Sequence, residues 1–258
     1  RERDKFHIKK HISESTKLID VTDEYCVLGI FGPKSRELLK ALSDDDFSNL
    51  NFKFGTGKNI YIKKVNIWAQ RLSYVGDLGY ELYIKMHDAK KIYNLIVDKG
   101  KSFKLSHCGV HAMDIMRMES GFLHWGHDIS PEENQYEAKL DFAISHKKNI
   151  EFIGKKALED IKLKKIKKKF VMLTLQNSEP GKPLMLHDEP IYLNEKIIGR
   201  TTSANYSFSF NKNLAFGYVN SDDFLKLNEG NLEIEIEKIK YKADYLEKKL
   251  NQKDYKTI

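Results

Sequence analysis

The sequence lacks a long apolar run and contains only two cysteines. No stretch approaches the roughly 20 apolar residues that cross a bilayer, so we expect neither a membrane-spanning protein nor a membrane partner. Cys26 and Cys108 are too few to form a disulfide framework. This scarcity favours a reducing compartment, which would be the cytoplasm or, in a eukaryote, the mitochondrial matrix.

Arginine is also scarce, although the chain is basic. Lysine and arginine together number 44 against 37 acidic residues, a net charge of +7, but only six of them are arginines: Arg1, Arg3, Arg36, Arg71, Arg117 and Arg200. Nucleic-acid readers rely on arginine forks, and the lysine tract 162–169 has neither arginine nor interleaved aromatic residues. We therefore expect no nucleic-acid partner. A basic nucleic-acid module stays an alternative, and it would be retained on DNA in a strongly salt-dependent manner.

Common signatures of phosphate loops, nucleophiles and metals are missing as well. Residues 54–58 (FGTGK) lack the spacing of a phosphate-binding loop, and neither a G-x-G-x-x-G after a strand nor a G-x-S-x-G elbow occurs. His107 and His111 could share a helix face, but no closing carboxylate or cysteine pair has suitable spacing for zinc. We expect no metal site, and the sequence assigns no catalytic residue.

Apolar patterning in the first part of the chain predicts strands mixed with helices. The run 24–31 predicts a buried strand, and a helix is expected to follow over 34–42. A second helix should be capped by Asp88 and end at Gly100, and a third should cover 109–119. This order of elements is typical of an α+β fold.

A β-hairpin is expected between the first two helices. Two alternating runs, 65–74 and 80–84, enclose the turn Gly76–Gly79, where glycine permits a positive φ. A period of two places Tyr80, Leu82 and Ile84 on one face of the second strand, and Glu81 and Tyr83 on the other.

Beyond about residue 160 the pattern changes to short strands. Six apolar runs separated by turn residues are typical of a small barrel or sandwich: 170–175, 184–187, 189–193, 197–202, 214–219 and 232–237. We therefore predict an α/β domain over residues 1–160 and an all-β domain over 161–258.

Glu81 is the candidate ligand-binding residue of the hairpin. A charged residue on a strand usually faces only solvent. Its neighbours here are aromatic, with Tyr83 on the same face and Tyr74 expected across the hairpin. A carboxylate beside aromatic rings suits a flat heterocycle, because its two oxygens can accept adjacent N–H and NH₂ donors in one plane. Pterin and guanine both present such an edge, and the solvent-facing alternative stays open.

Several segments, taken in order, resemble the folate-binding aminomethyltransferase family, which includes the glycine-cleavage T-protein. They are RLSYVGDLGYELYI at 71–84, MDIMRMESGFLHWGHDI at 113–129, NQYEAKLDF at 134–142, FIGKKAL at 152–158, and residues 187–219. The last segment is similar to the C-terminal barrel of dimethylglycine and sarcosine dehydrogenases.

The resemblance implies a folate-binding α/β domain, incomplete at its N-terminus, followed by a small β-barrel. It implies tetrahydrofolate as cofactor, with Glu81 on the pterin edge and Tyr74, Leu82, Tyr83 and Phe142 lining the folate site. In the dehydrogenases a flavin domain oxidises an N-methylated glycine, and the folate half converts the released one-carbon unit to 5,10-methylenetetrahydrofolate. FAD and a flavin dehydrogenase partner are expected only if such a domain or subunit exists outside this chain.

The chain departs from the family pattern in two places. Met113 stands where the T-protein carries a folate-contacting arginine, and the family's catalytic aspartate would lie upstream of the residues that align with 1–6. We therefore expect a module of a larger enzyme. The alternative is a catalytically inactive folate-fold scaffold or regulatory module, which would bind folate without turnover.

Overall fold

The computed structural model describes residues 1–145, 148 and 150–257. It divides into two compact units. The first contains Arg1–Ser73, Asp77–Ser106 and Tyr255–Ile258, and the second contains Tyr74–Gly76 and His107–Asp254.

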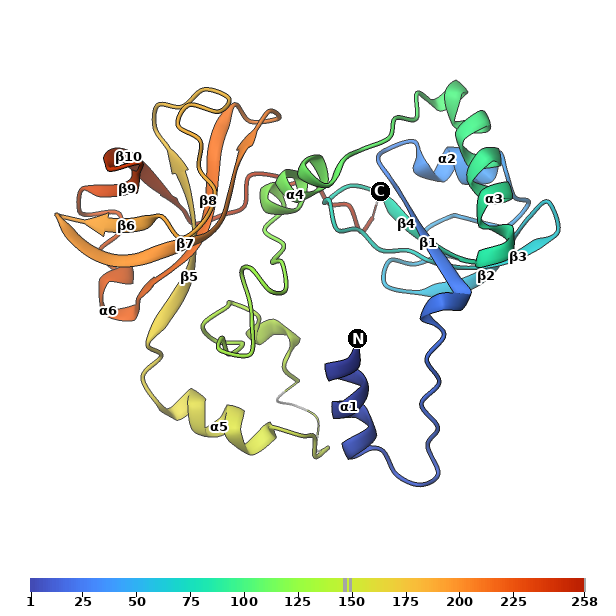
Figure 1. Cartoon of the computed structure of the whole chain (residues 1–258), viewed down its shortest axis with the longest axis horizontal. Helices are drawn as coiled ribbons and strands as arrows, with labels where there is room; N and C mark the ends of the chain where they lie inside the picture. Colours follow the sequence, from blue (N-terminus) through green and yellow to red (C-terminus); the bar gives the residue numbers. More distant parts are fainter. Residues whose placement is uncertain (146–147, 149, 258) are drawn as a thin grey trace. The chain divides into compact units, whose positions relative to one another are not determined.

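The first unit is built on an antiparallel four-stranded sheet. Its strands lie in the order β1 (Tyr25–Phe31), β4 (Gly79–Lys85), β3 (Val65–Gln70) and β2 (Gly57–Ile62). The helices α2 (Ser35–Lys40) and α3 (Met86–Gly100) lie beside this sheet (Figure 1). Apolar side chains from the sheet and both helices form one core, which includes Leu38, Leu39, Ile60, Ile67, Leu82, Ile84 and Ile92.

The alternation predicted for β4 is confirmed. Tyr80, Leu82 and Ile84 are each 0% exposed and lie in the core, whereas Glu81 and Tyr83 are only half-buried. The predicted helices over 34–42 and 109–119 and the one ending at Gly100 are also confirmed. Asp88 is not the helix cap, because α3 begins at Met86 and has no side-chain cap; Asp88 lies in its first turn.

The predicted hairpin differs from the observed one. Strand β3 ends at Gln70, which pairs with Glu81, so Tyr74 lies outside the sheet and not across from Glu81. The chain leaves the ladder at Arg71, whose side chain is 1% exposed and donates to the Phe52 carbonyl at 2.8 Å. The Arg71 amide donates to the Thr56 carbonyl at 2.9 Å, so the backbone follows β2 instead of turning directly back along β4.

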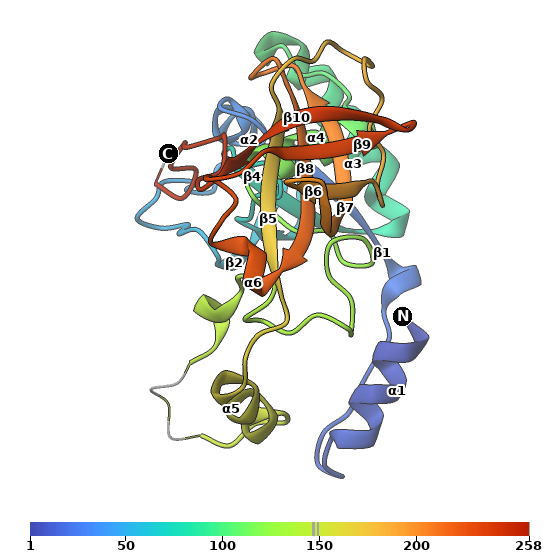
Figure 2. The ribbon, with the colours of Figure 1, turned by 90° about the vertical axis from the view of Figure 1, so that its left-hand side faces the viewer.

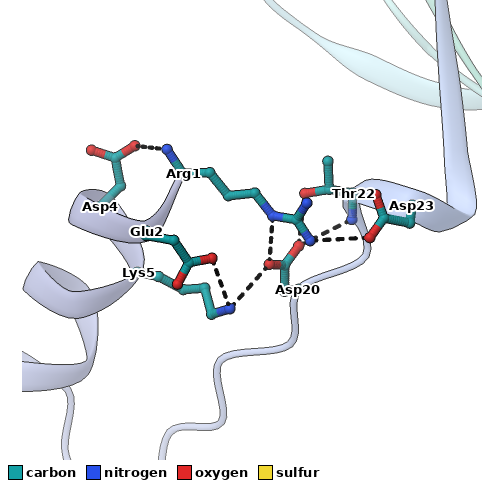
Figure 3. A network of polar contacts seen from close by, with 7 residues as sticks. All are labelled: Arg1, Glu2, Asp4, Lys5, Asp20, Thr22 and Asp23. Atoms are coloured by element: carbon teal, nitrogen blue, oxygen red, sulfur yellow. Dashed lines mark hydrogen bonds and ion pairs between the residues drawn. The ribbon is translucent and has the colours of Figure 1, made fainter.

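The chain begins with a helix that the sequence did not predict. Helix α1 (Glu2–His11) has no buried residue and is followed by a 3₁₀ turn at Thr22–Glu24. Side chains of α1 contact the segment just before this turn. Arg1 Nε donates to Asp20 Oδ2 at 3.0 Å, and Lys5 Nζ lies 3.4 Å from the same oxygen (Figure 3). Ion pairs, rather than apolar packing, therefore attach α1.

The second unit contains a closed six-stranded barrel (Figure 2). Around the barrel the strands run β10 (Ile239–Leu246), β5 (Lys168–Leu175), β8 (Lys212–Asn220), β7 (Lys196–Ser207), β6 (Pro190–Leu193) and β9 (Leu232–Ile236). The same unit holds α4 (Val110–Glu119), a 3₁₀ turn at Asp141–Ala143, α5 (Lys155–Leu163) and α6 (Ser221–Phe224). Inward residues such as Val171, Leu173, Ile191 and Ile234 fill the barrel.

The barrel confirms the predicted all-β segment but corrects one strand. Residues 184–187 form no strand, because the Leu186 amide donates to Glu189 Oε1 at 2.6 Å instead of to a ladder partner. The sixth strand is β10, which the sequence analysis missed. Among the described residues, no helix is both long and apolar enough to cross a bilayer.

Candidate functional site

Strand β4 presents Glu81 and Tyr83 on the sheet face opposite its buried residues. In the sheet register, Glu81 lies between Gly29 on β1 and Gln70 on β3, and Tyr83 lies between Val27 and Trp68. Val27 is 49% exposed and Trp68 is 40% exposed. We call this surface the Glu81 face; it comprises Val27, Gly29, Phe31, Gly57, Trp68, Gln70, Glu81 and Tyr83.

A hydrogen bond from Tyr83 orients the Glu81 carboxylate. The Tyr83 hydroxyl donates to Glu81 Oε2 at 3.0 Å. Burial raises the pKa of the Tyr83 phenol above its ordinary value, and the hydrogen bond to Glu81 and the charge of Glu81 raise it further. The phenol therefore stays protonated and remains a donor at neutral pH. Because an ionised carboxylate offers about four acceptor positions, Glu81 can still accept further donors.

Two glycines allow aromatic rings to lie close to the sheet on either side of Glu81. A Cβ added at Gly29 would lie 2.5 Å from the Phe31 ring, and one at Gly57 would lie 2.5 Å from the Trp68 ring. Gly29, Glu81, Gln70 and Gly57 form one cross-strand row. The carboxylate and the Gln70 amide are therefore flanked by ring surfaces, an arrangement that suits a flat polar ligand.

The other predicted site residues lie elsewhere. The Leu82 side chain is in the core on the opposite side of the sheet. Tyr74 belongs to the second unit, where its ring stacks on Phe122 with centroids 6.1 Å apart and its hydroxyl donates to the Leu123 carbonyl at 3.1 Å. Phe142 is also in the second unit and is 82% exposed. The structure thus brings Glu81 and Tyr83 together, and the folate roles of Tyr74, Leu82 and Phe142 stay predictions.

The second unit contains a buried charge cluster that the sequence analysis did not single out. Arg117 on α4 is 1% exposed and donates to Asp128 Oδ2 at 2.5 Å and to Asp114 Oδ1 at 2.9 Å. It also donates to Ser203 Oγ on β7 at 2.9 Å. Asp128 in turn accepts from Thr202 Oγ1 at 2.6 Å. These bonds fasten α4 and the following loop to the barrel.

Two of the described histidines lie next to each other. His124 and His127 have ring centroids 4.6 Å apart. Within the part of the chain that the structure describes, no group of three or more histidine, cysteine, aspartate or glutamate side chains is placed to hold a metal ion.

Family comparisons define the class of protein to which this fold and site belong. The model of the GCVT N-terminal domain matches residues 1–148, and the model of the glycine cleavage T-protein C-terminal barrel domain matches residues 168–250. The chain therefore belongs to the glycine cleavage T-protein family. The domain boundary predicted near residue 160 falls between the two matched ranges and stays a prediction.

Similar proteins include dehydrogenases and aminomethyltransferases. Human mitochondrial dimethylglycine dehydrogenase is 36% identical over 84% of this chain and 24% of its own length. Human mitochondrial sarcosine dehydrogenase is 31% identical over the same share of each chain. The aminomethyltransferase of Bacillus subtilis is 31% identical over 86% of this chain and 60% of its own length. The chain thus spans about a quarter of the dehydrogenases.

A solved structure supports the fold. The glycine cleavage system aminomethyltransferase T from Bartonella henselae superposes with a TM-score of 0.73 and covers 86% of this chain and 58% of its own. Because the two sequences are only 22% identical, this likeness shows the architecture and nothing finer.

Proposed function

We propose that this chain binds tetrahydrofolate and forms 5,10-methylenetetrahydrofolate from the one-carbon unit released when an N-methylated glycine is oxidised. It would act as part of a dimethylglycine or sarcosine dehydrogenase-like protein, in which a flavin domain or subunit carries out the oxidation. Membership of the glycine cleavage T-protein family and the two dehydrogenase relatives support this proposal.

The observation that carries the proposal is the Glu81 carboxylate on the Glu81 face. Tyr83 donates to one of its oxygens at 3.0 Å, and no described residue is recorded as donating to the other. A pterin edge carries adjacent N–H and NH₂ donors, which two carboxylate oxygens can accept in one plane. The flanking rings of Phe31 and Trp68 supply apolar surface for the ring system. The donor and acceptor chemistry of these residues therefore fits a reduced folate.

In this proposal Glu81 binds the pterin edge and Tyr83 positions Glu81. Tetrahydrofolate, when bound, supplies the two nitrogens that capture the one-carbon unit. The contribution of this chain is orientation, which can account for a large share of a transfer rate without a covalent nucleophile. Since Leu82 points into the core, it would contact a ligand only through its backbone. For Tyr74 and Phe142, we propose only the folate roles that the family resemblance implies.

The proposal is tested by calorimetric titration of the wild-type chain and two variants with tetrahydrofolate. Glu81→Ala should weaken binding at least tenfold, since a lost hydrogen bond to a charged group costs about 1.5–3 kcal/mol. Glu37→Ala is the matched control, because Glu37 is an exposed carboxylate on α2. Equal affinity of all three proteins would reject the role of Glu81. Wild-type binding without any one-carbon transfer, even with a flavin dehydrogenase supplied, would favour the scaffold alternative.

A further inference from the structure

Two lysines lie against one aromatic side chain that packs on the barrel core. Lys169 Nζ on β5 lies 4.7 Å from the centroid of the Phe224 ring on α6. Lys139 Nζ lies 5.3 Å from the same centroid and 5.6 Å from that of Tyr245 on β10. We call these four residues the Lys139 cluster. They come from four separate segments of the second unit.

The backbone holds Lys139 in this place. The Phe170 amide donates to the Glu137 carbonyl at 2.9 Å, which ties the turn that carries Lys139 to β5. Lys139 itself has a φ of 57°, a left-handed conformation that is uncommon for a residue with a side chain. Phe224 and Tyr245 pack against the barrel core and against each other, with centroids 5.6 Å apart. The cluster therefore rests on a rigid surface.

The lysines of the cluster are not ion-paired within the part of the chain that the structure describes: no carboxylate there lies within ion-pair distance of Lys139 or Lys169. The two acids of α6 are occupied elsewhere: Asp222 pairs with Lys165, and Asp223 lies 3.0 Å from Lys196 Nζ. The pKa of Lys139 lies below its ordinary value, first because its ammonium is partly buried against the rings and then because Lys169 is close. Two like charges thus lie near each other, and neither is ion-paired to a described carboxylate.

Tyr245 adds a third donor to the cluster. Lys139 Nζ donates to the Tyr245 hydroxyl oxygen at 3.3 Å, so the phenolic hydrogen is directed elsewhere. Burial raises the pKa of Tyr245, and the charge of Glu247 raises it further, so the phenol stays protonated. The cluster therefore offers two ammonium groups and one phenol hydroxyl as donors.

We propose that the Lys139 cluster is an anion-binding site for a phosphate group. A phosphate dianion matches the two positive charges, whereas a single carboxylate would neutralise only one. Its several oxygens can accept from Lys139, Lys169 and Tyr245 at once. The site is distinct from the Glu81 face, and it does not depend on the proposed folate function.

Inorganic phosphate is the probe for this site, measured by calorimetry and thermal melting at constant ionic strength. Phosphate should bind the wild-type chain and raise its melting temperature. Lys139→Gln and Lys169→Gln should each weaken phosphate binding at least tenfold. Lys162→Gln, which removes an exposed lysine of α5, should leave binding unchanged. Because the two lysines repel each other, Lys139→Gln should not lower the melting temperature in phosphate-free buffer.

Three results would overturn the assignment. The first is no phosphate binding to the wild-type chain at millimolar concentration. The second is binding that all three variants retain equally, which would mean general attraction to a basic surface. The third is binding of citrate as tightly as phosphate, which would contradict the ligand class. Since the titration contains no folate, its failure would leave the proposed function of the Glu81 face untouched.

Discussion

Tyr83 and Glu81 act as one unit on the exposed side of β4. The sequence could predict that both point away from the core, since strict alternation places Leu82 between them on the opposite face. It could not predict that Gly29 and Gln70 flank Glu81, because cross-strand partners depend on strand order and register. It also misplaced Tyr74, whose position depends on where β3 ends.

The ionisation of Tyr83 reports on this pair. Burial contributes most to its raised pKa, and Glu81 contributes the rest through a hydrogen bond and its charge. Glu81→Gln should therefore lower the Tyr83 pKa but leave it above the ordinary value for a tyrosine. ¹³Cζ-tyrosine NMR across an alkaline pH titration measures the change, with Tyr83→Phe to assign the resonance. An unchanged midpoint in Glu81→Gln would contradict the observed contact.

The attachment of α4 to the barrel depends on the buried pair of Arg117 and Asp128. Removing one partner of a buried ion pair typically costs about 3–5 kcal/mol, because the other charge is left buried and unpaired. Asp128→Ala should therefore lower the free energy of unfolding by about that amount in chemical denaturation. Asp114→Ala is the matched control: Asp114 bonds the same arginine but is 27% exposed, so its loss should cost clearly less. Equal costs would show that burial of Asp128 does not govern the attachment.

Helix α1 should be sensitive to acid because Asp20 holds it. Hydrogen bonds from Thr22, followed by one from Arg1, lower the pKa of Asp20. A lowered carboxyl pKa gives a contribution that is complete above the unfolded value and disappears as the pH falls through the folded value. The helical ¹³Cα shifts of α1 should thus weaken only below about pH 4, where a free aspartate begins to protonate.

The variant Asp20→Asn distinguishes the loss of the Asp20 ion pairs from general acid denaturation of the protein. Asp20→Asn should weaken the same α1 shifts at neutral pH, since it removes the charge that Arg1 and Lys5 share (Figure 3). Asp23→Asn should have a smaller effect, because Asp23 contacts only one Arg1 nitrogen, at 3.2 Å. If α1 shifts in Asp20→Asn match the wild type, ion pairing does not hold this helix.

Elements were predictable where local pattern and long-range contacts agree. The alternation of β4 and the helix that ends at Gly100 satisfied both. Strand β3 was predicted too long because Leu72 and Tyr74 continue an apolar pattern. The observed strand ends at Gln70, and the next residue, Arg71, turns its side chain inward to the Phe52 carbonyl. Strand β10 was missed although its sequence alternates: Lys240, Lys242 and Asp244 stand between the positions that face the barrel core, Tyr241, Ala243 and Tyr245.

Each compact unit has its own apolar core. A cavity in one core should therefore destabilise the elements of that unit first. Leu82 and Leu173 are both 0% exposed, and they belong to the cores of the first and the second unit respectively. Each change to alanine should lower the free energy of unfolding by about 2–5 kcal/mol through the cavity it leaves. Hydrogen exchange with mass spectrometry should show the loss of protection first in β3 and β4 for Leu82→Ala, and in β5 and β8 for Leu173→Ala. The reverse pattern would contradict the assignment of the cores.

Strands β1 and β4, helices α2, α3 and α4, the all-β second half and the outward position of Glu81 followed from the sequence. The barrel was implied by the resemblance and is confirmed, although the short strands alone left a barrel and a sandwich open. The α4 attachment and the Lys139 cluster did not follow from the sequence, because each joins residues far apart in the chain. Lys139 and Lys169 lie near Phe224 and Tyr245 only through the barrel pairing. No local pattern encodes that proximity.

The central claim is that the Glu81 carboxylate meets the donor edge of a pterin. Titration with tetrahydropterin, which lacks the aminobenzoyl-glutamate tail, tests this contact alone, with the fluorescence of Trp68 on the same face as the signal. The account predicts that the wild-type chain binds tetrahydropterin and that Glu81→Gln, which replaces one acceptor by a donor, binds at least tenfold more weakly. Equal affinity of the wild type and Glu81→Gln would contradict it.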